Sequence, residues 1–362
     1  MLVAVTALRV GLRDSRGARA GTSKSATRRL GRNPMRSKNF WLLLWCTLLV
    51  ALVLPAAAQQ PRKVPRVGYL AAVSASADAP RLEAFRQGLR ELGYVEGQNI
   101  LIDYRHENVD FERLPRLAAE LLRLDVDVLV AVTTNAALAA KKTTTTTPIV
   151  FMGVTDPIST GLAESLARPG GNSTGITNVA AVLAGKRLEF LKETLPGIAR
   201  VAVLWDPQAP GSIPQWKESQ VPAEKLRLQL YPMEVSSVDH YAPAFKEALK
   251  ARNQAVWVTL NPLANSNQKV IAELAIDSRL PSICARGDYA ENGCLMAYGP
   301  GYSTEGRDGA RYVDKILKGA RPADLPIEQP TTFELVVNLK TARRIGVVVP
   351  QSVLDRADKV IQ

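Results

Sequence analysis

The sequence predicts an α/β protein made of two units, each a parallel sheet covered by helices. Strand-like and helical segments alternate with short connections from Arg66 onward. The strand segments are apolar at nearly every position, which is typical of strands buried on both faces of a parallel sheet. The alternation also occurs twice, and 362 residues are enough for two domains of ordinary size.

The first unit is predicted to contain four strands and three helices. Its strand segments are "RVGYLAA", "NILIDYR", "VDVLVAV" and "PIVFMG". Between the first two strands, "RLEAFRQGLREL" places Phe85, Leu89 and Leu92 on one helical face, and Gly93 is expected to end that helix. The other helices are "ERLPRLAAELLRL" and "TTNAALAAKK". This order, strand and helix in turn, predicts one parallel sheet.

The second unit repeats the pattern. Its strand segments are "RVAVLW", "LQLYPMEV", "AVWVTL" and "PSICAR", and its helices are "GKRLEFLKETLP" and the segments 241–252 and 267–278. The last third is less regular. It contains an amphipathic helix, "STEGRDGARYVDKILKG", and a strand followed by a short helix, "FELVVNLKTARRIG". The pattern does not assign these later segments to either unit.

Most of the net charge of +12 belongs to the N-terminus. Residues 1–58 hold ten Lys or Arg and one Asp, whereas the rest of the chain holds 36 basic and 33 acidic residues. The body of the protein therefore lacks the broad basic surface that nucleic-acid binding requires.

A signal peptide is predicted at 35–58. Two basic residues after Met35 precede the apolar segment 40–54, and three alanines before Gln59 offer a cleavage site. The apolar segment is shorter than the roughly 20 residues of a membrane-spanning helix, so we expect cleavage and a periplasmic location. Residues 1–34 carry eight basic groups and are expected to be a non-native or disordered upstream extension.

Cleavage would leave only Cys284 and Cys294 as cysteines. An oxidising compartment permits a disulfide between them, with two buried free thiols as the alternative. If the two residues lay on opposite sides of a hinge crossing, the bridge would restrain motion between the units. His106 and His240 are the chain's two histidines, and no pair of Cys or His has metal-site spacing, so no structural metal is expected.

Motifs for catalysis and for nucleotide cofactors are missing from the sequence. There is no Gly-x-Ser-x-Gly elbow, no Gly-x-x-x-x-Gly-Lys-Ser/Thr loop and no Gly-x-Gly-x-x-Gly after the first strand. The histidines lie in a loop and before a helix, where they are expected to be surface residues. We therefore expect neither an enzyme nor a cofactor.

Polar residues at the carboxyl ends of the strands form the predicted ligand site, because open α/β sheets bind ligands there. The candidates are Ser74, Ser76, Thr133, Thr134, Asn135, Thr155, Asp156, Asn178, Asp206, Asn261, Arg286, Asp288 and Tyr289. Residues 133–135 open a helix whose free N–H groups suit an anion. Asp156 could meet an ammonium group and Arg286 a carboxylate. The alternative for each residue is that it caps a helix or a turn.

Several long, ordered motifs extend over almost the whole chain after the signal peptide. They are "AFRQGLRELGYVEGQNI", "LAAELLRLDVDVLVAVTTNAALAAK", "PIVFMGVTDPISTGLAESLARPGGNSTGIT", "GKRLEFLKE", "VAVLWDP" and "YVDKILKGARPADLPIEQPTTFELVVNLKTARRIG". With them the sequence resembles the bacterial ABC-transporter substrate-binding family that includes the tryptophan-binding TrpX type. The resemblance implies a type I periplasmic-binding-protein fold, with two α/β lobes, three crossovers and a ligand between the lobes.

The resemblance also implies where the chain crosses between lobes. It implies a first part of lobe one at 59–177, lobe two at 178–288, a return to lobe one at 289–325, and a final crossover with the C-terminal segment at 326–362. Residues 155–156 would lie at the cleft. "GGNSTGITN" would be the first crossing segment, in which glycines and small hydroxyls suit a strand that approaches the ligand and flexes.

The expected function is that of a secreted, monomeric solute receptor that delivers a small organic molecule to an ABC permease. An amino acid or an aromatic or carboxylate compound would suit the predicted site. An orphan or chemosensory receptor remains an alternative. A transcriptional sensor would need an N-terminal helix-turn-helix, and a two-lobe enzyme would need an acid/base pair or a nucleophile; the sequence favours neither.

Overall fold

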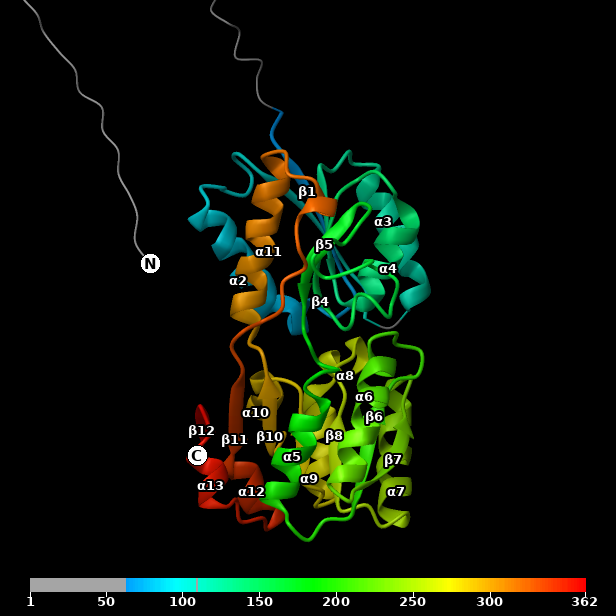
Figure 1. Ribbon diagram of the computed structural model, residues 1–362, viewed down its shortest axis with the longest axis vertical. Coiled ribbons are helices and arrows are strands. Elements are labelled where there is room, and N and C mark those ends of the chain that lie inside the picture. Colours follow the sequence, from blue (N-terminus) through cyan, green and yellow to red (C-terminus); the bar gives the residue numbers. More distant parts are fainter. Residues whose placement is uncertain (1–62, 109) are drawn as a thin grey trace, which may run out of the picture. The chain divides into compact units, whose positions relative to one another are not determined.

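Two sheets organise the residues that the computed structural model describes, 63–108 and 110–362 (Figure 1). Residues 63–362 form one compact unit. The predicted extension at 1–34 and signal peptide at 35–58 lie outside the described residues. Within the described part of the chain, no helix is both long enough and apolar enough to cross a membrane.

The first sheet has five parallel strands in the order β2-β1-β3-β4-β5. The strands are β1 (Arg66–Ala71), β2 (Leu101–His106), β3 (Val128–Val132), β4 (Ile149–Val154) and β5 (Ser173–Thr177). The accompanying helices are α2 (Ala75–Glu91), α3 (Leu114–Leu122), α4 (Thr134–Thr143) and α11 (Tyr302–Leu317), with the short 3₁₀ turns η1 (Phe111–Arg113) and η3 (Pro322–Asp324). Four of these strands are the predicted ones, and β5 is the predicted crossing segment.

Both faces of the first sheet are buried, which explains its continuous apolar strands. Leu129 and Phe151 belong to the core on the side of α3 and α4. Val130 and Met152, their neighbours in sequence, belong to the core on the side of α2 and α11. Successive residues of a strand point to opposite faces of the sheet. A sheet that is covered on both faces therefore needs apolar residues at odd and even positions of each strand.

The second sheet has seven strands in the order β12-β11-β10-β9-β8-β6-β7. The strands are β6 (Arg200–Trp205), β7 (Gln229–Glu234), β8 (Ala255–Val258), β9 (Ser282–Cys284), β10 (Met296–Gly299), β11 (Glu334–Asn338) and β12 (Lys359–Ile361). The accompanying helices are α5 (Ala184–Thr194), α6 (Ser212–Lys225), α7 (Tyr241–Lys250), α8 (Pro262–Ser266), α9 (Gln268–Asp277), α10 (Gly287–Glu291), α12 (Leu339–Ile345) and α13 (Gln351–Leu354), with η2 (Val238–His240). Strands β10 and β11 are antiparallel to each other.

The predicted return to lobe one at Tyr289 is wrong. Strand β10 pairs with β9 and β11 in the second sheet, so the chain returns only after Gly299. Helix α11 then packs against α2 on the first sheet, and β11 and β12 complete the second sheet. Lobe one is therefore 63–177 with 300–329, lobe two is 178–299 with 330–362, and the chain crosses between them three times. Strand β10 is largely buried, and its hydrogen-bonding partners are β9 and β11 of the second sheet.

Gly175 on β5 allows two strands to approach closely. It lies opposite Phe151 in the β4–β5 register and has φ of +151°. A Cβ at this position would lie 2.0 Å from the Phe151 carbonyl oxygen. The glycine is therefore required by strand packing, whereas the sequence had suggested an approach to the ligand.

We expect Gly175→Ala to destabilise the fold by about 1–3 kcal/mol, because the strand must shift to relieve the overlap. Gly197→Ala is the matched control, since a Cβ there meets nothing within 4 Å. Denaturant unfolding of both variants measures the difference. Equal stability of the two would contradict the packing role of Gly175.

Cys284 and Cys294 form a disulfide, which decides between the two alternatives that the sequence left open. Cys284 ends β9 and Cys294 precedes β10, so both cysteines belong to lobe two. The bridge therefore does not span a hinge crossing, and the idea that it restrains motion between the lobes is wrong.

Candidate ligand-binding site

A cavity lies between the carboxyl ends of the strands of lobe one and those of lobe two. From lobe one it is lined by α2, the start of α4, the end of β4 and the start of α11, and from lobe two by α5, α8 and the turn before α10. Seven of the predicted site residues line it: Thr133, Thr134, Asn135, Thr155, Asn178, Asn261 and Arg286. The rule that ligand sites form at strand ends therefore located the cavity.

The start of α4 presents polar groups to the cavity that have no partner in the described part of the chain. Thr133, at the N-cap, has φ of 80°, a conformation that β-branched residues rarely adopt. Its hydroxyl and the Oδ1 atom of Asn135 are buried and make no hydrogen bond to the described residues. The hydroxyl of Thr134 instead accepts a hydrogen bond from the Thr155 amide at 3.1 Å. A polar ligand would give Thr133 and Asn135 the partners they lack.

Asn178 connects the end of β4 to the first crossing. Its Nδ2 donates to the Gly153 carbonyl at 2.8 Å, and its Oδ1 accepts from the Thr155 hydroxyl at 3.1 Å and from the Ala180 amide at 2.9 Å. These bonds satisfy the Asn178 amide within the protein. Asn178 therefore lines the cavity and also fixes the crossing segment.

Asn261 holds the start of α8, on the lobe-two wall. Its Oδ1 accepts from the Ala264 amide at 2.8 Å, which makes it the N-cap of that helix. Asn261 therefore caps α8 and also lines the cavity.

Arg187 on α5 is a buried cation without an acidic partner among the described residues. It is fully buried and lines the cavity. Its guanidinium donates to three carbonyl oxygens, those of Tyr298 at 2.9 Å, Ala180 at 2.8 Å and Ala285 at 3.4 Å. Burial, together with the nearby Arg286, lowers the pKa of Arg187 to about 9. The cavity wall therefore carries a buried guanidinium that forms no ion pair with an acidic group of the described structure.

The sequence contained a signal for Arg187 that the strand-end rule missed. Ala184, Leu188 and Leu191 form the buried stripe of α5, and Arg187 lies within that stripe. A charged residue on the apolar face of a helix is unusual, because an unpaired buried charge is costly.

Arg286, before α10, contrasts with Arg187 because it has a carboxylate partner. Its guanidinium lies 3.1 and 3.2 Å from the two oxygens of Asp288 and 3.0 Å from Asn265 Oδ1. It also donates to the hydroxyl of Tyr302, whose ring lies 3.8 Å away. Burial would lower the pKa of Arg286, but Asp288 raises it above its usual value. The predicted site residue is therefore present in the cavity with its charge already paired.

Arg81, Glu305 and Asp308 are the charged residues that line the cavity from lobe one, and Asp308 is paired with Arg311. Arg81 on α2 lies 2.7 Å from Asp78 and 3.1 Å from Glu305 on α11. The other oxygen of Glu305, Oε1, is buried without a hydrogen-bond partner in the described residues. The sequence showed Asp78 and Arg81 three residues apart, but α11 comes more than 200 residues later, so only the fold brings Glu305 to them.

The other predicted site residues do not line this cavity, and most of their polar groups form hydrogen bonds with other parts of the protein. The Ser74 hydroxyl caps α2 by accepting from the Ala77 amide, and Ser76 lines a separate groove beside α8 and α9. The Asp206 carboxylate accepts from the Gln208 amide and the Ser236 hydroxyl. For Ser74 and Asp206 the capping alternative was the better interpretation.

Asp288 and Tyr289 lie behind the cavity wall and support it. Asp288 pairs with Arg286 and accepts from Gln268 at 2.6 Å. The Tyr289 hydroxyl donates to Asn265 Oδ1 at 2.7 Å. Both residues therefore hold cavity-lining side chains in place.

Asp156 also lies outside the cavity. Its backbone is left-handed, with φ of 44°, and its carboxylate accepts from the Ser159 amide at 3.1 Å. The acidic group thus stabilises the turn after β4, and the predicted contact with a ligand ammonium group is not supported.

We expect Asp156→Asn to leave ligand affinity within twofold of the wild type and stability within about 1 kcal/mol, because Asn retains the capping oxygen and tolerates the left-handed backbone. Calorimetric titration and thermal unfolding measure the two quantities. A tenfold loss of affinity would mean that Asp156 contacts the ligand.

The sequence model described as ABC transporter substrate binding protein matches residues 66–361. The chain belongs to this family, whose members bind solutes. It is 24% identical over 277 residues to a tyrosine-binding protein of Clostridioides difficile, a match that covers 75% of this chain and 79% of that protein.

Among the solved structures that share the fold are the following two. A conserved domain protein of Vibrio cholerae matches with a TM-score of 0.79 and 26% identity, over 82% of this chain and 100% of that one. An ABC domain from Streptococcus pneumonia in complex with L-Trp matches with a TM-score of 0.77 and 26% identity, over 82% of this chain and 99% of that one. The two-lobe fold predicted from the resemblance is confirmed.

Proposed function

We propose that this protein is the secreted receptor of an ABC uptake transporter and that it closes its two lobes around an amino acid or a similar small carboxylate. The observation that carries the proposal is Arg187, a fully buried guanidinium in the cavity wall whose hydrogen-bond partners are all neutral carbonyls. A bound carboxylate would supply the missing negative charge. Charge-assisted hydrogen bonds of this kind are among the strongest in proteins.

The cavity also contains the negative charge of Glu305, which favours a zwitterionic ligand over one that carries only a carboxylate. Glu305 Oε1 and Asn135 Oδ1 are buried acceptors without partners in the described structure, and an ammonium group would donate to such atoms. The apolar part of the lining would receive the ligand's side chain; it includes Ile176, Leu260, Pro262, Pro300 and Pro330. The tyrosine-binding relative and the L-Trp complex support aromatic amino acids as the first ligands to test.

Contacts between the lobes support closure as the mechanism. The Ser74 amide of lobe one donates to the Ser266 hydroxyl of lobe two at 3.1 Å. The ring of Tyr302, from lobe one, lies between Arg81 of its own lobe at 4.3 Å and Arg286 of lobe two at 3.8 Å. A ligand that contacts both lobes would favour the closed form, which the permease would then recognise.

A thermal-shift screen tests the ligand class. At a concentration about 100 times its Kd, a bound ligand stabilises the protein by about 2.7 kcal/mol. We expect L-tryptophan or L-tyrosine to raise the melting temperature and the matching amines, tryptamine and tyramine, to have little effect. A protein that responds to sugars and not to carboxylates would contradict the proposed function.

Export is tested separately. Expression from Met35 in a Gram-negative host should yield a periplasmic protein whose N-terminus lies at or near Gln59, because the small residues at 56–58 form the cleavage site. Intact-mass spectrometry of the periplasmic fraction measures the cleavage. A membrane-bound product that retains residues 40–54 would contradict secretion.

A further inference from the structure

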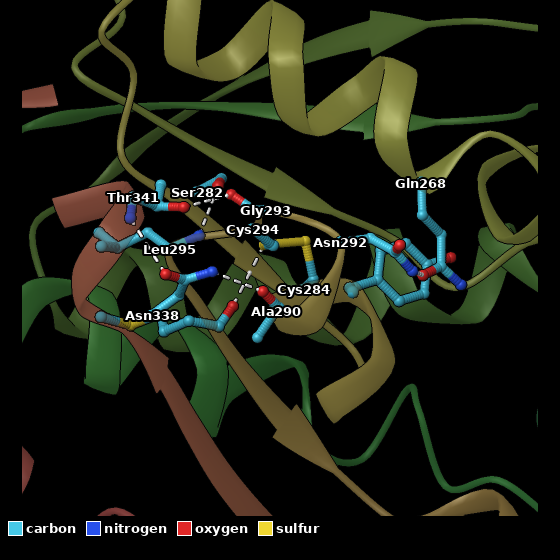
Figure 2. Close-up of a disulfide and its surroundings, with 12 residues drawn as sticks. Gln268, Ser282, Cys284, Ala290, Asn292, Gly293, Cys294, Leu295, Asn338 and Thr341 are labelled. Atoms are coloured by element: carbon cyan, nitrogen blue, oxygen red, sulfur yellow. Dashed lines mark hydrogen bonds between the residues drawn. A yellow bond between two sulfur atoms is a disulfide. The ribbon is translucent and has the colours of Figure 1, made fainter. Parts of the chain in front are cut away.

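The Cys284–Cys294 disulfide closes a loop that borders the cavity. The loop begins at the last residue of β9, contains the five-residue helix α10 and ends just before β10. Both cysteines are buried, with 1% and 2% of their surface exposed. Figure 2 shows the bridge at the base of this loop, beside Ala290 and Asn338.

The closed loop supplies polar groups to both cavity arginines of lobe two. Arg286 is the loop's second residue after Cys284, and its counter-ion Asp288 lies in the same loop. The carbonyl of Ala285, also in the loop, accepts from Arg187 at 3.4 Å. The Arg286–Asp288 ion pair lies within the loop, and Asp288 also accepts a hydrogen bond from outside the loop, from Gln268 of α9 at 2.6 Å.

Two side chains near the end of β11 and the start of α12 hold the far half of the loop. Asn338 donates to the Ala290 carbonyl at 2.8 Å and Thr341 donates to the Gly293 carbonyl at 2.9 Å, as the dashed lines in Figure 2 show. A helix as short as α10 has little stability of its own. The bridge joins this far half to Cys284, which pairs with Ala297 in the sheet and lies two residues before Arg286.

On the near half, α8 and α9 each supply one side-chain anchor from lobe two. Asn265 Oδ1 of α8 accepts from Arg286 at 3.0 Å and from the Tyr289 hydroxyl at 2.7 Å, and Gln268 of α9 donates to Asp288 at 2.6 Å. These hydrogen bonds constrain the loop less than a covalent link.

We infer that the Cys284–Cys294 disulfide is a positioning device for ligand recognition, which holds Arg286 and the Ala285 carbonyl where the cavity needs them. The inference rests on the proposed binding of a carboxylate ligand. Without the bridge, the loop samples more conformations in the ligand-free protein, and binding must then order it. The consequence is weaker binding in addition to lower stability.

The test uses the Cys284→Ala/Cys294→Ala double variant of the mature chain, compared with the wild type and with Leu117→Ala. Leu117 is a buried residue of α3 in lobe one and does not line the cavity, so Leu117→Ala is a control for general destabilisation. Hydrogen exchange of the ligand-free proteins measures the order of the loop. Calorimetry with L-tryptophan and L-tyrosine, well below every melting temperature, measures affinity.

We expect the amides of Asn292 and Gly293, which donate within the loop, to exchange about tenfold faster in the double variant. We also expect Kd to rise about tenfold for whichever amino acid binds the wild type. Leu117→Ala should change both by less than twofold. Wild-type exchange throughout 285–293 in the double variant would overturn the inference, and so would unchanged Kd.

If neither amino acid binds the wild type, the proposed ligand fails, while the exchange comparison still decides whether the bridge orders the loop. If the double variant does not accumulate, wild-type protein reduced with TCEP provides the form without the bridge. Its two free thiols are counted by mass after alkylation. The same exchange result then supports or overturns the positioning role.

Discussion

Arg187→Gln should weaken ligand binding by about 100-fold and leave the melting temperature of the ligand-free protein nearly unchanged. The affinity loss follows from removing the buried cation that faces the ligand's carboxylate, since each hydrogen bond to a charged group contributes about 1.5–3 kcal/mol. Isothermal titration calorimetry with L-tryptophan or L-tyrosine measures the loss.

Stability is expected to change little because two effects of Arg187→Gln oppose each other. The folded protein disfavours the charged form of Arg187, which is why its pKa falls to about 9, so removal of the charge is favourable to folding. The lost hydrogen bonds to the carbonyls of Tyr298, Ala180 and Ala285 are unfavourable. The melting temperature should stay within about 3 °C of the wild type. A large fall would mean that Arg187 is a structural residue.

The Arg286→Gln protein should be less stable than the wild type and should bind the ligand more weakly. Its removal leaves Asp288 without its cation, and breaking a buried ion pair costs about 3–5 kcal/mol. The lower end applies, since Asp288 is 21% exposed and keeps its hydrogen bond from Gln268. The melting temperature should fall by about 5 °C or more. The ion pair with Asp288 therefore gives Arg286 a structural role as well as a place in the cavity wall.

The double variant Arg286→Gln/Asp288→Asn separates the two roles of Arg286. Neutralising both partners removes the unpaired charge, so most of the lost stability should return. Ligand affinity should stay low, because the cavity still lacks the Arg286 cation. Thermal unfolding and calorimetry on the four proteins form a double-mutant cycle. If Asp288→Asn restores affinity as well as stability, Arg286 acts only by holding the loop.

Most of the fold could be predicted from local patterns. The strands of the first sheet are apolar at odd and even positions alike, and that pattern alone indicates a sheet covered by helices on both faces. The boundary at Tyr289, which the resemblance implied, was wrong because β10 pairs with β9 and β11 in the second sheet. A strand of four residues shows no local pattern from which that pairing could be predicted.

The lining of the candidate cavity was predicted in part, for a physical reason. Residues at strand ends such as Thr133, Thr155 and Arg286 line it because strand ends meet at one edge of each sheet. Arg187 and Glu305 come from helices, and which face of a helix meets the cavity depends on how the lobes are joined. Asp156 lies outside the cavity, and the sequence could not predict this because a carboxylate that caps a turn looks the same in sequence as one that meets a ligand.

Calorimetry that compares L-tryptophan with L-tryptophanamide, and L-tyrosine with its amide, tests the central claim most directly. The amide keeps the side chain and the amino group and lacks the carboxylate. We predict that the wild type binds at least one of the amino acids about 100-fold more tightly than its amide, and that Arg187→Gln reduces this preference to a few-fold. Equal binding of acid and amide by the wild type, or a preference that Arg187→Gln leaves intact, would contradict the assignment of Arg187 as the partner of the ligand's carboxylate.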